Sequence, residues 1–209
     1  MKLFYVAAIA CMVLITGCAR QDYRRAEPGI RLVTKEHISV GVQDHRPYVI
    51  NHDKEEYFVG IQRGAFGIPG SLITQSTRPL TEDMTGVLVK SLANTGATAI
   101  PMTITPAMDM GSILQMARSQ QSDKIVLLTL QDWETDTFHS TDLIYNVSMT
   151  IFDSQGHEIA KKQLHGKDNL GSDVLNPQSV PIELAPISFQ HKMEELFSGD
   201  ILTALSKNH

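Results

Sequence analysis

Two stretches in the second half of the chain constrain the fold most strongly, because both have the length and patterning of β-strands. Residues 124–130 form an apolar run after Lys124, and such a run without polar alternation is typical of a strand covered on both faces. Between Leu143 and Ile151, apolar residues alternate strictly with polar or smaller ones, which predicts a long strand with one buried face. We therefore expect a sheet in which the 124–130 segment is central.

Local signals predict the remaining elements. The turn at 153–156 leads into residues 158–164, which predicts an antiparallel hairpin with the 143–151 strand. Period-two patterns predict strands at 37–42, 57–62 and 97–100. Helices are expected from a Thr81 cap to Gly96, after an Asp109 cap, and over 189–205 with a break at Gly199.

This order of elements predicts an α/β (α+β) fold. The expected architecture is a mixed β-sheet with a C-terminal antiparallel hairpin and about three packed helices. Two helical crossovers between strands imply that part of the sheet is parallel.

The N-terminus has the layout of an export signal. Lys2 supplies the positive charge, and an apolar segment follows to Leu14 before small residues break it. The segment is shorter than the roughly 20 apolar residues that cross a bilayer. Residues 1–17 are therefore interpreted as a signal peptide.

The residues Ile15-Thr16-Gly17-Cys18 resemble the bacterial lipobox. The resemblance implies that Cys18 receives a diacylglycerol, that the chain is cut before it, and that palmitate-type acyl chains anchor the protein to a membrane. Because Ala19 rather than Asp follows the cysteine, the resemblance implies the periplasmic leaflet of the outer membrane. Residues 18–36 lack periodicity and predict a flexible tether, and residues 37–209 predict a single domain.

Composition excludes some function classes. The formal net charge of −5 argues against nucleic acid as a partner. The two cysteines are Cys11, which leaves with the signal peptide, and Cys18, which is consumed by lipid. No thiol then remains for a disulfide, a nucleophile or a metal, and no cofactor is expected.

The pattern of strands and helices resembles a known group of envelope proteins. Residues 40–47, the helix from Leu88 to Gly96, and the segments 125–135 and 143–156 resemble the YajG-like uncharacterised lipoproteins, whose fold is similar to the amino-terminal domain of TolB. The penicillin-binding-protein activator lipoproteins look like relatives of this architecture. The insertion from Tyr48 to Pro79 departs from its simplest version.

Four residues are candidates for contacting a protein partner: Arg46, Phe66, Ile68 and Trp133. Phe66 and Ile68 lie in a glycine-rich loop, Gly64 to Gly70, which lacks the Lys-Ser/Thr of a phosphate-binding loop and favours a hairpin or an exposed partner-binding loop. Arg46 could instead form a structural pair with Asp44, and Trp133, like Tyr145, could pack in the core.

No residue pattern predicts a catalytic or metal site. Asp44, His45, His52 and Asp53 lack the spacing of zinc ligands, and His139 is likewise treated as a solvated residue. Asp132, Glu134 and Asp136 alternate along one strand, which is typical of a solvent-facing side. A hydrolase would require Asp44, Asp132 or Glu134 to converge in a cleft.

The expected function is therefore that of a non-enzymatic lipoprotein that binds another envelope protein as an adaptor. The alternative is an auxiliary lipoprotein of a transport system, which would hold a lipid or small apolar ligand between sheet and helix. An internal cavity would favour the alternative, and a filled core would count against it.

Overall fold

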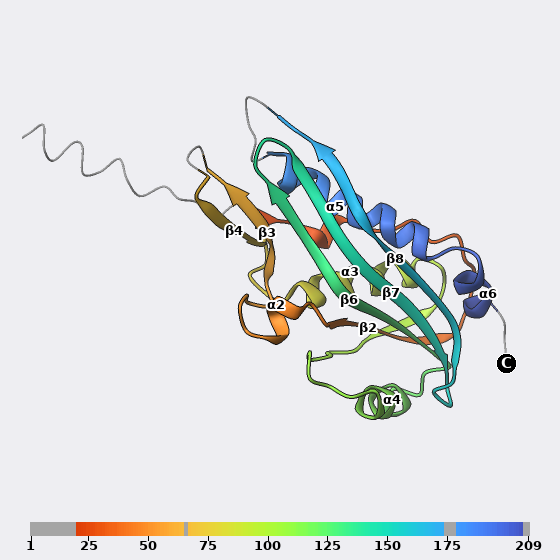
Figure 1. Ribbon diagram of the computed structural model, residues 1–209. Coiled ribbons are helices and arrows are strands. Elements are labelled where there is room, and N and C mark those ends of the chain that lie inside the picture. The colour runs from red at the N-terminus through yellow and green to blue at the C-terminus, as the bar shows by residue number, and fades with distance from the viewer. Residues whose placement is uncertain (1–19, 65–66, 174–178, 207–209) are drawn as a thin grey trace, which may run out of the picture.

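The computed structural model describes residues 20–64, 67–173 and 179–206, and it has the predicted mixed α+β architecture (Figure 1). The strands are β1 (Arg20–Gln21), β2 (His37–Asp44), β3 (Phe58–Arg63), β4 (Pro69–Thr74), β5 (Thr98–Pro101), β6 (Lys124–Thr137), β7 (Thr141–Asp153) and β8 (Glu158–Gly171). The helices are the 3-10 helix η1 (Tyr23–Arg25), α2 (Pro47–Ile50), α3 (Leu80–Ala93), α4 (Met110–Ser119), α5 (Ser179–Leu196) and α6 (Asp200–Ser206).

Strand β6 organises the sheet. One edge of its first half pairs in parallel with β2, and the same edge of its second half pairs in parallel with β3. The other edge pairs antiparallel with β7 over its full length, and β7 pairs in turn with β8. These pairings confirm the predicted hairpin and the central position of the 124–130 segment.

The two halves of β6 differ in how they are covered, which explains their sequence patterns. In the first half, Val126 and Leu128 face the main core, while Ile125 and Leu127 face a second cluster built around α4. Both faces are buried, as the continuous apolar run requires. The second half lies outside the reach of this second cluster, so Trp133 and Thr135 point inward while Asp132 and Glu134 lie half-buried on the other face.

Helices α3, α5 and α6 cover the main face of the sheet. The core between them contains Met84, Leu88, Phe189, Met193 and Ile201, all 0% exposed. The chain breaks between α5 and α6 at Gly199, whose φ of 60° favours glycine, as predicted. Asp109 caps α4 through a 2.7 Å bond from the Ser112 amide, whereas α3 begins at Leu80 and takes in Thr81 instead of starting from it.

The segment expected to be a tether is part of the folded domain over residues 20–36. β1 pairs in parallel with β4, and Tyr23 and Ala26 belong to the main core. Ile30 and Leu32 pack against the same core. The prediction of an 18–36 tether is therefore wrong for residues 20–36. The apolar side chains of this segment are scattered and have no periodicity, so the sequence pattern does not show that they pack against the main core.

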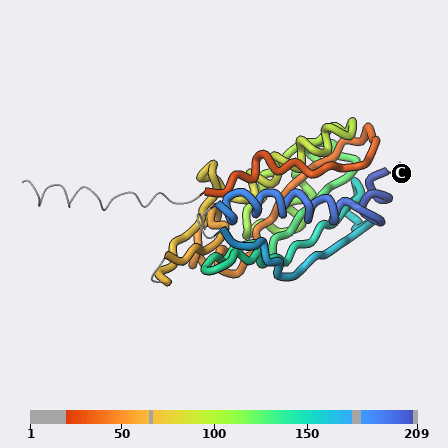
Figure 2. The backbone as a smooth tube through the Cα atoms, turned by 90° about the horizontal axis from the view of Figure 1, so that it is seen from above, coloured from red at the N-terminus to blue at the C-terminus, as the bar shows by residue number. Residues whose placement is uncertain are grey.

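The molecule has two distinct ends. The beginning of β1, the β3–β4 hairpin and the β6–β7 turn gather at one end, and α4, α6 and the end of the described chain lie at the other (Figures 1 and 2). We call these the hairpin end and the distal end. The inserted segment from Tyr48 to Pro79 supplies α2, β3 and β4 and so builds most of the hairpin end.

Candidate functional site

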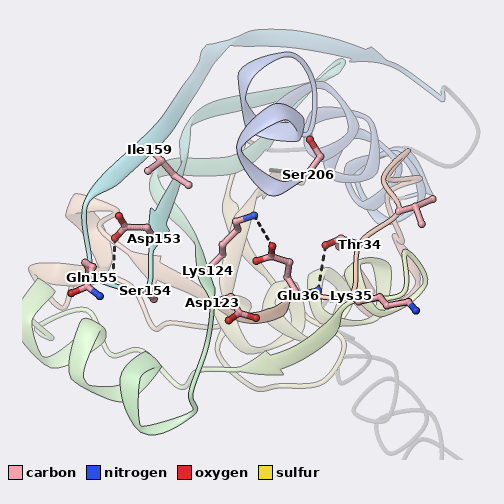
Figure 3. Close-up of a pocket in the computed structure, with 11 residues that line it drawn as sticks. Thr34, Lys35, Glu36, Asp123, Lys124, Asp153, Ser154, Gln155, Ile159 and Ser206 are labelled. Atoms are coloured by element: carbon pink, nitrogen blue, oxygen red, sulfur yellow. Dashed lines mark hydrogen bonds and ion pairs between the residues drawn. The ribbon is translucent and has the colours of Figure 1, made fainter. Parts of the chain in front are cut away.

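An open pocket of about 820 Å³ lies at the distal end, where β2, β6 and β8 begin and β7 and α6 end (Figure 3). We call it the distal pocket. Nine of its eleven lining residues are polar or charged; the full set is Val33, Thr34, Lys35, Glu36, Asp123, Lys124, Asp153, Ser154, Gln155, Ile159 and Ser206.

A buried ion pair forms the floor of the distal pocket. The Lys124 Nζ lies 3.2 Å from Glu36 Oε1, and the two side chains are 2% and 12% exposed. The same Nζ donates to the carbonyl oxygen of Leu205 at 3.2 Å, which ties the end of α6 to the sheet. In Figure 3 the two side chains point toward each other at the centre of the pocket.

The other carboxylates of the pocket hold backbone amides in place. Asp123 accepts from the His37 amide at 2.8 Å. Asp153 Oδ1 accepts from the amides of Gln155 and His157, both at 2.9 Å, and so shapes the β7–β8 turn. Burial raises the pKa of Asp153, but the hydrogen bonds from His157 and Gln155 outweigh it and hold this pKa below its ordinary value.

These contacts determine what the pocket can do chemically. Lys124 and Glu36 neutralise each other at the floor, so the charges that face the open volume are those of the exposed Lys35 and Asp123 and of the half-buried Asp153. Among the described residues no group of three or more His, Cys, Asp or Glu is arranged to hold a metal ion. The arrangement suits reversible recognition of a polar, charged segment, with fixed donors and acceptors on the walls.

The predicted partner-contact residues do not gather at this pocket. Ile68 is 70% exposed and lies at the hairpin end, beside the start of β4. Phe66 and the lipidation residue Cys18 lie outside the described residues.

Arg46 is buried and so is corrected as a surface contact. Its guanidinium is 0% exposed and binds Asp44 at 2.6 Å and the Phe58 carbonyl at 2.7 Å. The structural pair of Asp44 with Arg46, which the sequence favoured, is confirmed.

Trp133 is likewise an interior residue and not a surface contact. It is 0% exposed, and its Nε1 donates to the Tyr23 hydroxyl at 2.9 Å. That hydroxyl donates to Gln21 at 2.6 Å, and Gln21 donates to Thr135 at 3.0 Å. The indole therefore anchors the N-terminal segment to β6, a role that could be foreseen only if residues 20–26 were known to be folded.

The acidic residues of β6 are partly withdrawn from water. The Tyr48 hydroxyl donates to Asp132 at 3.3 Å, and Arg63 pairs with Asp136. Burial raises the pKa of Asp132, and burial together with the charges of Asp132 and Asp136 raises the pKa of Glu134. Asp44 is held by Arg46 and Asp132 by Tyr48, so both of these carboxylates have a fixed hydrogen-bond partner.

Sequence reasoning missed Glu36 and Lys124 as site residues. The available signal was a pair of adjacent, oppositely charged residues at or directly before the start of each of two apolar strands, Lys35-Glu36 and Asp123-Lys124. Such residues usually lie in solvent, and here the return of α6 onto the sheet buries them.

Comparison with known proteins supports the fold. No family model matches the sequence, and no curated protein is similar to it. The fold is similar to that of XCC0632, a DUF330 protein from Xanthomonas campestris, with a TM-score of 0.51 and 12% identity over 89% of this chain and 92% of that one.

Two more distant solved structures are lipoprotein GNA1162 from Neisseria meningitidis and the LpoB C-terminal domain from Salmonella enterica. The GNA1162 match has a TM-score of 0.32 and 11% identity over 77% of this chain and 99% of that one. The LpoB match has a TM-score of 0.32 and 12% identity over 66% of this chain and 85% of that one. Of the three, XCC0632 passes 0.5 and so shares the fold.

Proposed function

We propose that this protein is a lipid-anchored binding module of the bacterial cell envelope that recognises a charged segment of another envelope protein in its distal pocket. It acts as a non-enzymatic adaptor on the periplasmic face of the outer membrane, with Cys18 as the lipidated residue. A relationship to the YajG-like lipoproteins and to TolB is part of the same proposal. Among the described residues, no helix has the length and apolar character needed to cross a membrane.

The observation that carries the proposal is the position of the distal pocket relative to the N-terminus. The residues that line the pocket lie at the distal end, and the start of β1 lies at the opposite, hairpin end. A protein anchored near β1 would turn this pocket away from its point of attachment. The lining offers charges of both signs at fixed positions, which favours selective binding of a polar partner over a purely apolar one.

The packing between sheet and helix counts against the alternative of a lipid carrier. Trp133, Tyr23 and Phe189 fill that space edge to face, with ring centroids 5.7 to 6.4 Å apart. All three side chains are 0% exposed. The aromatic cluster thus occupies the position where that alternative requires its ligand.

Photocrosslinking in cells tests the proposal. A photoreactive residue replaces Gln155 in the pocket or, as a control, Gln163 on the exposed side of β8. We expect one recurrent envelope protein to be captured from position 155 and not from position 163. Ser154→Arg should abolish the capture, because Ser154 is an exposed lining residue and the larger cation fills the pocket without disturbing the core.

Two results would contradict this function. One is capture of the same proteins from both positions, unaffected by Ser154→Arg. The other is turnover of a substrate by the purified protein that single substitutions in the pocket abolish, which would make the pocket an active site.

A further inference from the structure

The hairpin end of the molecule carries exposed apolar side chains that the binding role does not use. Ile68, directly before β4, is 70% exposed, and Phe138 in the β6–β7 turn is 48% exposed. β3 and β6 run parallel, with Gln62 level with Thr137, so the residues that follow both strands emerge at the same end. The amide of Gly64 donates to the carbonyl of Ile68 at 3.0 Å, which fixes Ile68 opposite the end of β3.

The direction of β1 shows on which side the preceding chain must be attached. β1 is parallel to β4, with Arg20 level with Ile73. Because β4 runs away from the hairpin tip, the N-terminal direction of β1 points toward that tip. Ile68 lies five residues before Ile73, which is about 16 Å farther toward the tip at the rise of an extended strand.

The distance from Arg20 to Cys18 is too short to hold the domain clear of a membrane. Two residues span at most about 7 Å even when fully extended. If Cys18 carries lipid, the bilayer surface therefore lies within this reach of Arg20, while the hairpin tip extends farther in the same direction.

We propose that the hairpin end docks onto the lipid bilayer, with Ile68 and Phe138 inserted at the membrane surface. This inference rests on the lipid anchor of the proposed function and adds the orientation of the domain. Exposed apolar side chains at one end of a lipoprotein lose contact with water when they enter the membrane surface. This burial adds to the membrane affinity that the acyl chains supply. Val33, which is 92% exposed at the distal end, is the matched apolar residue that should stay in water.

Fluorescent labelling of the full-length lipidated protein tests the docking. Single cysteines replace Ile68, Phe138, Val33 or Ile187, each is labelled with an NBD fluorophore, and the protein is reconstituted in vesicles of phosphatidylethanolamine and phosphatidylglycerol. We expect a blue shift and a loss of iodide quenching at positions 68 and 138 only. Positions 33 and 187 should be quenched equally with and without vesicles.

The outcomes separate this inference from the proposed anchor. If the protein floats with the vesicles but labels at 68 and 138 remain fully quenched, the docking proposal is overturned and the anchor is not. Protection at position 187 in their place would also overturn it, because the domain would then lie on α5. If lipidated protein cannot be obtained and the chain does not float, the anchor itself fails.

Discussion

At the scale of single residues, two buried ion pairs bracket β2. Asp44 at its end binds Arg46, and Glu36 just before its start binds Lys124. Burial of charge is unfavourable unless each group finds a partner, so both pairs depend on accurate placement of the chain around them. The first pair could be predicted because its members are two residues apart, whereas the second joins residues from separate segments and could not.

The Asp44 and Arg46 pair makes a strong prediction for stability. Arg46→Met keeps most of the side-chain volume but leaves the buried carboxylate of Asp44 without its cation. We expect a loss of about 3–5 kcal/mol in the free energy of unfolding, measured by urea denaturation monitored by Trp133 fluorescence.

Lys90→Met is the matched control, because Lys90 pairs with Glu27 on the surface with 62% of its side chain exposed. Lys90→Met should lower the free energy of unfolding by no more than about 1 kcal/mol. Equal effects of the two substitutions would show that the Arg46 pair contributes no more than a surface pair.

Glu134 makes a prediction about pH. Burial, reinforced by Asp132 and Asp136, raises the pKa of this carboxyl above its ordinary value of 4.5. The folded protein therefore binds the proton more tightly than the unfolded chain, so Glu134 lowers stability as the pH rises through its pKa. Glu134→Gln should stabilise the protein at pH 7, and the gain should disappear below about pH 4.

Thermal unfolding of both proteins across this pH range measures the effect. Glu158→Gln, at an exposed position at the start of β8, is the control and should change stability little at any pH. If Glu134→Gln raises the thermal stability by the same amount at acidic pH, the effect comes from packing and not from the charge of Glu134.

At the scale of elements, periodicity predicted the strands that have a long buried face. β2, β3, β6 and β7 follow from their apolar patterns. β8, whose residues are all exposed or half-buried, follows from the turn at 153–156 before it, and the break between α5 and α6 follows from Gly199. β1 and β4 were not predicted, because β1 is a two-residue strand and β4 begins with Pro69 and Gly70, which carry turn signals. Tertiary pairing overrides local preference in both.

The close approach of β3 to β6 can be tested at Gly60. A Cβ at this position would lie 2.3 Å from Thr135 Oγ1 and 2.4 Å from the Thr135 carbonyl oxygen. Gly60→Ala should therefore push β3 away from β6 and lower the free energy of unfolding by about 1–3 kcal/mol. Hydrogen exchange should show faster exchange of the β3 amides.

Gly64→Ala is the control, since the nearest atom to a Cβ there is 3.9 Å away. It should leave both stability and exchange close to those of the original protein. Slow exchange of β3 in Gly60→Ala would mean that the two strands can separate slightly without losing their pairing.

At the scale of the whole molecule, the fold class followed from the sequence, but the functional geometry did not. The distal pocket is built from the ends of four strands and a helix, and no local pattern marks such a meeting point. The sequence left surface and interior roles open for Arg46 and Trp133, and contacts with the inserted segment and with residues 20–26 place both side chains in the interior. The fold class could be predicted because it depends on periodicity within each segment. The distal pocket could not be predicted because it depends on contacts between segments that are distant in the sequence.

The continuity of β6 has a consequence for how the molecule comes apart. Residues 124–130 of β6 pair with β2 near the distal pocket and residues 135–137 pair with β3 near the hairpin, while β7 runs alongside both parts with a register shift between Leu130 and Asp132. β7 is therefore the strand that joins the two halves of β6 across the stretch where neither β2 nor β3 is paired. A protease that cleaves within β6 would disrupt both ends of the molecule, because the same strand pairs with β2 at one end and with β3 at the other.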